Sequence, residues 1–309
     1  MTPPIGAIVG PTASGKTELA LAVAERLPIE IVVADSRQVY RGMDIGTAKP
    51  DASARQAVPH HLLDLVAPDE PFTLADWLAR ARQVVGEVWA RGRLPLLVGG
   101  SGLYVSALVD GYQLGAQPPS PELRRGLAAE LGADGLQPMA ERLAALDPIA
   151  AAATDLRNPR RVLRALERVL GAGAPTALAA ARPWPGSIAL IGIRRPRPLL
   201  DARIRQRAAG MFASGLLAEV KELLARGYGA ELGPMTGHGY REALRVVTGE
   251  WDVPHAIEVT ALHTRQYAKR QMTWFGRDPR IAWLEAGEGS AADLAPEAVE
   301  RLRPLLTAG

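Results

Sequence analysis

Short apolar runs alternate with amphipathic stretches along the first hundred residues. The runs at 5–9, 29–34 and 94–98 consist mainly of aliphatic side chains and contain almost no polar residue, as in strands that are covered on both faces of a parallel sheet. Between them, residues 18–27 and 74–90 repeat apolar positions at helical spacing. Strands alternating with helices predict an α/β fold with a mainly parallel sheet.

The pattern changes between residues 117 and 185, where helical spacing continues without strand-like runs. Stretches rich in Pro and Gly, 115–121 and 171–185, bound this segment. We expect helices at 122–131, 135–146 and 159–170 within it.

Beyond this segment, residues 188–193 predict another buried strand, and 199–226 predict a long helix that Gly210 and Gly215 interrupt. The sequence therefore predicts a core formed by residues 1–116 and 186–309, into which a small all-helical domain, 117–185, is inserted.

The composition of the 309 residues, 48% hydrophobic and 22% charged, is ordinary for a globular protein. No apolar run approaches the roughly 18 residues of a membrane span, and no charged and apolar leader precedes the first strand. We therefore expect a cytoplasmic protein with no membrane contact. The absence of cysteine excludes disulfides, thiolate zinc sites and cysteine nucleophiles.

Residues 10–17, Gly-Pro-Thr-Ala-Ser-Gly-Lys-Thr, fit the G-x-x-x-x-G-K-[ST] pattern between a predicted strand and a predicted helix. In this context the glycines allow backbone N–H groups to surround an anion, and the helix N-terminus and Lys16 add positive charge. Thr17 is expected to hold Mg²⁺. We predict a P-loop phosphate site made of Gly10, Pro11, Thr12, Ala13, Ser14, Gly15, Lys16 and Thr17.

Two further strand ends are expected near this loop, because ligands bind outside the carboxyl ends of strands in open α/β sheets. Asp35 follows the second strand, although such a residue also serves as a turn or helix cap. The glycines at 99–102 follow the third strand and suit either a ligand loop or a plain turn. The long polar loop at 37–50 is more typical of a functional segment than of filler.

Arginine clusters suggest an anionic partner, although each has an ordinary structural explanation. In the helix at 159–170, the arginines lie toward one side with Glu167 as the only acid among them, which favours a phosphate backbone over a solvated helix face. Arg203 and Arg207, four residues apart, could close over departing negative charge or form surface ion pairs. Residues 264–277 mix cations, amides and aromatics, as in single-stranded RNA sites and in generic amphipathic helices.

The adjacent histidines His60 and His61 are expected to be structural, because neighbouring side chains point apart and metal ligands on one element are spaced further apart.

Five segments in order along the chain, 10–17, 35–50, 98–104, 158–167 and 264–275, resemble the bacterial tRNA dimethylallyltransferase family, also called isopentenyl transferases. The resemblance implies transfer of a dimethylallyl group from dimethylallyl diphosphate to N6 of the adenosine directly 3′ of the anticodon, adenosine-37, in tRNAs that read codons beginning with U. It implies a P-loop NTPase-like core, Mg²⁺ as cofactor, and the tRNA anticodon stem-loop as partner. We expect a monomer without an obligate protein partner.

The same resemblance assigns roles to individual residues. Asp35 is implied as the general base, and Lys16, Thr17 and Arg203 as the groups that stabilise the departing diphosphate. The implied tRNA contacts are Asp35, Ser36, Arg37, Gln38, Ser101, Arg124, Arg160, Arg161 and Arg164. The chain departs from the family pattern at Ser101, where Thr is frequent, at Arg160, where Gln is usual, and at His238, which replaces an apolar residue.

Two other functions fit parts of the pattern. A small-molecule kinase would use the same loop with ATP but would have no use for basic aromatic helices. An RNA-binding protein with a vestigial loop would tolerate the loss of Asp35. Labelled dimethylallyl diphosphate or ATP, supplied with unmodified tRNA, distinguishes the three.

Overall fold

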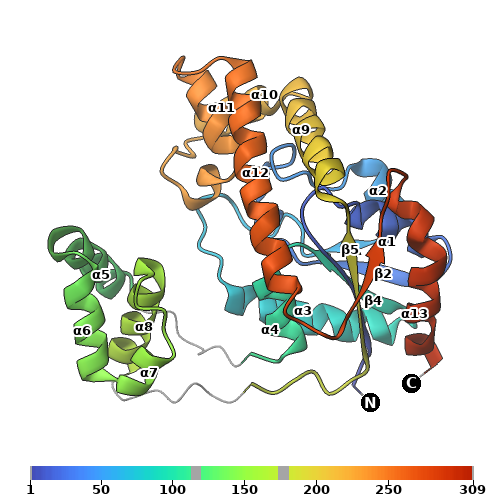
Figure 1. Ribbon diagram of the computed structural model, residues 1–309, viewed down its shortest axis with the longest axis horizontal. Coiled ribbons are helices and arrows are strands. Elements are labelled where there is room, and N and C mark those ends of the chain that lie inside the picture. Colours follow the sequence, from blue (N-terminus) through green and yellow to red (C-terminus); the bar gives the residue numbers. More distant parts are fainter. Residues whose placement is uncertain (1, 113–119, 173–180, 308–309) are drawn as a thin grey trace. The chain divides into compact units, whose positions relative to one another are not determined.

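In a computed structural model, which describes residues 2–112, 120–172 and 181–307, the chain forms two compact units (Figure 1). One comprises Met1–Gly111 and Pro183–Gly309, and the other comprises Tyr112–Arg182. The Pro- and Gly-rich segments 115–121 and 171–185, expected to bound the insertion, lie for the most part outside the described residues.

The larger unit is built on a six-stranded sheet with the order β3-β2-β4-β1-β5-β6 and parallel pairing throughout (Figure 1). The strands are β1 (Ile5–Val9), β2 (Ile29–Val33), β3 (His60–His61), β4 (Leu94–Gly99), β5 (Ile188–Arg194) and β6 (Ile281–Glu285). The predicted α/β fold with a mainly parallel sheet is confirmed.

Helices cover the sheet because successive side chains of a strand point to opposite faces. In β2, Ile29, Ile31 and Val33 share one buried cluster with Leu19 of α1 (Lys16–Ala24) and Leu302 of α13 (Ala295–Thr307). Helices α3 (Leu74–Ala90) and α4 (Gly102–Val109) contact the sheet and each other. Thr73 begins α3 with a capping box.

The other helices of this unit gather near the carboxyl ends of the strands. Helices α9 and α12 pack against each other, and α10 and α11 pack together beside them (Figure 1). Their bounds, with those of the remaining short elements, are α2 (Ala52–Ala57), α9 (Arg197–Ala213), α10 (Leu216–Ala225), η1 (Gly233–Thr236), α11 (Tyr240–Val247), α12 (Val253–Phe275) and η2 (Ala291–Leu294).

The long helix predicted at 199–226 is in fact two helices, α9 and α10. Gly215 separates them with φ +104°, a left-handed conformation that favours glycine. Gly210 lies within α9 and does not interrupt it, so that part of the prediction was wrong.

The smaller unit contains α5 (Pro121–Asp134), α6 (Leu136–Leu146), α7 (Pro148–Ala152) and α8 (Pro159–Ala172). Leu127, Met139, Leu143 and Leu166 form much of its core, each no more than 2% exposed. The three predicted helices of this segment are confirmed, and α7 is an addition.

None of the helices in the described ranges combines the length and the apolarity that a membrane crossing requires.

Candidate active site

The loop between β1 and α1 presents unpaired donors at the N-terminus of a helix. Within the described chain, the backbone N–H groups of Gly15, Lys16 and Thr17 donate to no protein acceptor. The Ser14 hydroxyl is buried and also lacks a partner among these residues. Because the three N–H groups lie at a helix N-terminus and the Ser14 hydroxyl is buried without a partner, these groups are available to an anion.

Close packing fixes the path of this loop. A Cβ at Gly10 would lie 2.8 Å from the Ile193 carbonyl oxygen, and Gly10 has φ +140°. Ala13 also adopts a left-handed conformation, φ +64°, which is uncommon outside glycine. The Lys16 ammonium folds back onto the loop and donates to the carbonyl oxygens of Gly10 (3.1 Å) and Pro11 (2.7 Å).

Two buried side chains from distant parts of the sequence brace the loop. Gln271 of α12 accepts from the Thr12 N–H at 2.8 Å and donates to the Gly100 carbonyl at 2.7 Å, so it connects the loops after β1 and β4. Arg195, directly after β5, donates to the Ser14 carbonyl at 3.0 Å. Neither residue was predicted as part of the site.

Cations outnumber carboxylates around the loop. Arg203 donates to the Ala13 carbonyl at 3.0 Å and to Glu18, and Arg207 donates to the Thr12 hydroxyl at 3.3 Å. Burial, together with Arg207, lowers the pKa of Lys16 to about 7. Burial likewise acts to raise the pKa of Glu18, but the Ala291 N–H and Arg203 hold it below its ordinary value. An anionic ligand would relieve this excess of positive charge.

The loop opens into a cavity of about 1190 Å³. Residues from the carboxyl ends of three strands line it, as predicted: the loop after β1, Asp35 after β2, and Gly99 and Gly100 at the end of β4. Arg203 and Tyr267 line it from α9 and α12. The half-buried Asp35 accepts from the Arg37 N–H at 2.8 Å, and Asp35 is a candidate proton acceptor in this space.

The residues after Asp35 are held by contacts within the chain. The Ser36 N–H donates to the hydroxyl of Ser101 at 3.1 Å, and Ser101 is only 8% exposed. The Arg37 guanidinium donates to the Gly233 carbonyl at 2.7 Å. The Gln38 amide nitrogen donates to the Thr47 carbonyl at 3.1 Å. These side chains therefore have structural partners before any ligand binds.

In the smaller unit, Glu167 of the arginine-rich helix α8 is buried, with a side-chain exposure of 4%. It accepts from Arg124 of α5 at 3.1 Å and from Arg164 at 2.6 Å, and these two cations offset the cost of burying the carboxylate. Arg160 and Arg161 are exposed.

Most of the mixed basic and aromatic stretch at 264–277 lies in α12, which turns some of its side chains toward the core and others toward solvent. Ala268, Gln271 and Phe275 are buried, whereas Lys269 and Arg270 are exposed. One side of the stretch therefore supports the site, and the other presents positive charge.

Three histidines, His60, His61 and His238, have contacts within the protein, and His60 also lines the cavity. His60 bonds to the Val58 carbonyl at 2.8 Å and His61 to Glu30 at 2.7 Å, which supports their structural interpretation. His238 stacks on His263 with ring centroids 5.8 Å apart, and burial lowers its pKa to about 4.

Ligand atoms of His238, His263 and Glu242 lie within 4.8 Å of one another. The Glu242 carboxylate already accepts from the Gly239 N–H at 2.7 Å and from Arg241 at 2.9 Å. Glu242 thus pairs with Arg241 and His263 inside the protein, and the His238 ring stacks on that of His263.

Comparison with known proteins identifies relatives along nearly the whole chain. A family profile described as IPP transferase matches residues 38–278, and one described as isopentenyl transferase matches residues 3–64. A protein of Roseiflexus sp. strain RS-1 named tRNA dimethylallyltransferase is 45% identical over 309 residues, or 99% of each sequence.

Solved structures agree with these matches. The crystal structure of a tRNA isopentenylpyrophosphate transferase from Bacillus halodurans is 37% identical, with a TM-score of 0.72 over 98% of this chain and 97% of that one. A tRNA isopentenylpyrophosphate transferase from Staphylococcus epidermidis is 33% identical, with a TM-score of 0.68 over 96% and 99% of the two chains. The similarity extends across both compact units.

Proposed function

The chain belongs to the IPP transferase family, and on that premise we propose that it transfers a dimethylallyl group from dimethylallyl diphosphate to N6 of adenosine-37, 3′ of the anticodon, in tRNAs that read codons beginning with U. The observation that carries this proposal is the cavity that brings the donor-rich loop and Asp35 together. The loop at 10–17 would hold the diphosphate, and Asp35 would accept a proton.

The diphosphate would bind at residues 10–17. Free N–H groups of Gly15, Lys16 and Thr17 would donate to its oxygens, and Lys16 and Arg203 would neutralise its charge. Residues 10–17 would recognise the diphosphate rather than the group attached to it, so a prenyl diphosphate can bind there in place of a nucleotide.

A divalent cation, Mg²⁺ in our proposal, fits this donor set. Mg²⁺ prefers oxygen ligands and is usually held by one or two protein groups together with substrate phosphates. Thr17 lines the cavity, and its hydroxyl would be the protein ligand. Bound Mg²⁺ would neutralise part of the charge that develops on the leaving diphosphate.

In the reaction, the bond between N6 and the allylic carbon forms as the bond between that carbon and the diphosphate oxygen breaks. The exocyclic amine is a poor nucleophile because its lone pair is delocalised into the ring. Asp35 would accept the proton that N6 loses. Positive charge develops on the allylic carbon and negative charge on the leaving group, where Lys16 and Arg203 would stabilise it.

The tRNA would contact both units. Adenosine-37 must leave the anticodon stack to reach the cavity, where Ser36, Arg37 and Gln38 would recognise its edge. Neighbouring nucleotides would meet Ser101 and Arg124, and the stem backbone would meet Arg160, Arg161 and Arg164 of the helical domain, residues 117–185. We propose that the enzyme acts as a monomer in the cytoplasm.

The test is to incubate the protein with Mg²⁺, unmodified tRNA and labelled dimethylallyl diphosphate, and separately with labelled ATP. Label in adenosine-37 of the RNA supports the proposal. RNA-independent phosphate transfer from ATP would identify a kinase instead, and tRNA binding without turnover would identify a binding protein. Omission of Mg²⁺, with EDTA present, should abolish transfer.

A further inference from the structure

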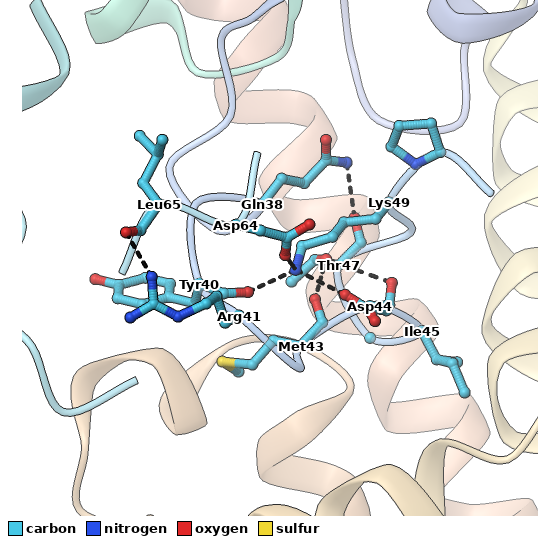
Figure 2. Close-up of polar contacts among 12 residues, drawn as sticks. Gln38, Tyr40, Arg41, Met43, Asp44, Ile45, Thr47, Lys49, Asp64 and Leu65 are labelled. Carbon is cyan, nitrogen blue, oxygen red and sulfur yellow. Dashed lines mark hydrogen bonds and ion pairs between the residues drawn. The ribbon is translucent and has the colours of Figure 1, made fainter. Parts of the chain in front are cut away.

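Lys49 has an almost completely buried side chain, 1% exposed, in the segment that follows β2. Figure 2 shows its ammonium between three oxygens: the Tyr40 carbonyl at 2.5 Å, Asp44 Oδ1 at 2.7 Å and Asp64 Oδ1 at 2.5 Å. An ammonium has three donors, and here each has an acceptor. Lys49 therefore joins both halves of the segment 35–50 to the chain after β3.

The same segment is closed on itself next to Lys49. The Gln38 amide nitrogen donates to the carbonyls of Thr47 and Ala48, the two residues directly before Lys49 (Figure 2). The Asp64 N–H donates to the Gln38 carbonyl at 3.2 Å. The positions of the Gln38 side chain and backbone thus depend on the positions of residues 47–49 and 64.

Backbone strain is concentrated at this point. Ala48 has φ +50° and Asp64 has φ +54°, both in the left-handed region that non-glycine residues rarely adopt. Such conformations persist only where the surroundings hold them, and they gather at functional sites. Lys49 follows one of these residues and forms an ion pair with the other, so its ammonium is well placed to hold both.

A carboxylate holds the segment from its other side. Glu219 of α10 accepts from the N–H groups of Asp44 at 3.0 Å and Ile45 at 2.8 Å, and from the Tyr240 hydroxyl at 2.5 Å. Burial and the Glu219 charge raise the pKa of Tyr240, so its hydroxyl remains a donor. Met43, which directly precedes these residues, is fully buried in the core that α10 and α11 share.

We propose that Lys49 and Glu219 are positioning residues that fix Asp35–Gln38 for the acceptor nucleotide, acting through the segment rather than on the reacting atoms. This inference rests on the proposed function, because it assigns those four residues to the acceptor. The inference separates two parts of the site. The loop at 10–17 holds the prenyl donor, whereas Lys49 and Glu219 determine how Asp35–Gln38 are placed against the acceptor nucleotide.

The test variant is Lys49→Met, which keeps the side-chain length and removes the donors. Displacement of a reacting group by about 1 Å can cost on the order of 10²-fold in rate, so we expect kcat to fall by about 10- to 100-fold. KM for tRNA should rise, and tRNA affinity measured without prenyl donor should fall. The Kd of a nonreactive thio-analogue of dimethylallyl diphosphate should stay within about twofold, because residues 10–17 are untouched.

Glu30→Gln is the matched control. Glu30 is similarly buried, 5% exposed, and pairs with Arg91 and His61 at the start of β2, the end of that strand far from Asp35. This variant should lose thermal stability while keeping kcat, KM and tRNA affinity at temperatures where it is folded. If Lys49→Met does not fold, Glu219→Gln should show the same split between tRNA and analogue on a smaller scale.

A folded Lys49→Met protein with unchanged kcat, KM and tRNA affinity would overturn the inference. So would equal losses of tRNA and analogue affinity, because these would indicate general loosening of the structure. Failure of the wild type to prenylate tRNA would overturn the proposed function instead. The tRNA affinity of Lys49→Met, compared with that of the wild type, would then test the inference.

Discussion

Raising the pH from 7 to 9 should weaken the binding of the nonreactive thio-analogue, because Lys16 must be protonated to pair with a diphosphate. In the free protein, burial and the nearby Arg207 lower the pKa of Lys16 from 10.5 to about 7. A bound diphosphate contributes negative charge beside the ammonium and raises that pKa again. Binding above pH 7 is therefore coupled to uptake of a proton.

The size of the effect follows from the shift. If binding restored the ordinary value of 10.5, the difference would correspond to roughly 5 kcal/mol. The Kd would then rise about tenfold per pH unit above 7, and up to about 50-fold between pH 7 and 9. The charge of the ligand is nearly constant there, because phosphate groups complete their second ionisation near pH 6.

Folding stability should change in the opposite direction. Between pH 7 and 10.5 the unfolded chain binds a proton at Lys16 that the ligand-free folded protein does not, so the free energy of unfolding rises with pH in that window. Loss of affinity above pH 7 therefore cannot be attributed to unfolding through this group.

Isothermal titration calorimetry at pH 7, 8 and 9, in two buffers with different ionisation enthalpies, measures both the Kd and the protons taken up. Lys16→Arg is the control, because a guanidinium stays charged over this range and its Kd should be nearly independent of pH. A wild-type Kd that stays constant from pH 7 to 9, without proton uptake, would show that Lys16 does not gain a proton on binding.

Three further predictions concern single side chains. Asp35→Ala should lower turnover by roughly 10²–10⁴-fold, the usual contribution of a general base, with tRNA affinity largely kept; an unchanged single-turnover rate would remove Asp35 from the mechanism. Gln271→Leu should leave the Thr12 N–H and the Gly100 carbonyl unpaired, at about 1–3 kcal/mol for each group; urea unfolding measures this, and an unchanged free energy would contradict the bridge. Burial acts to raise the pKa of Asp64, but Lys49 and Arg55 hold it below 3.8, so its stabilisation is present above that pH and declines below it; acid unfolding of Asp64→Asn should lack this component, and identical acid profiles would argue against the ion pair.

The sequence predicts the parts of the fold that local pattern determines. Strands β1, β2, β4 and β5 are mainly apolar runs with mostly buried positions, which Glu30 interrupts in β2 and Arg194 ends in β5. Strand β6, with the sequence IAWLE, was not predicted, and only two of its five residues are buried. Its pairing with β5 depends on contacts that a local pattern does not contain.

The same distinction applies to the site. Residues 10–17 are contiguous, so their role can be inferred from spacing alone. Gln271 and Arg195 act on that loop from distant positions, and no local signal marks them. Glu167 lies four residues after Leu163, on the apolar side of α8, and its carboxylate is buried there with Arg124 of another helix as a partner. Tertiary partners decide both cases.

The hydrogen bond between Thr12 and Gln271 also affects how the protein is made. A ribosome has synthesised most of the polypeptide before Gln271 exists, and residues 10–17 lack this partner until then. Strand β5, the neighbour of β1, likewise emerges only after the helical unit has been translated. The nascent chain therefore completes its anion-binding loop late, so premature termination before residue 271 should yield a product without a finished donor site.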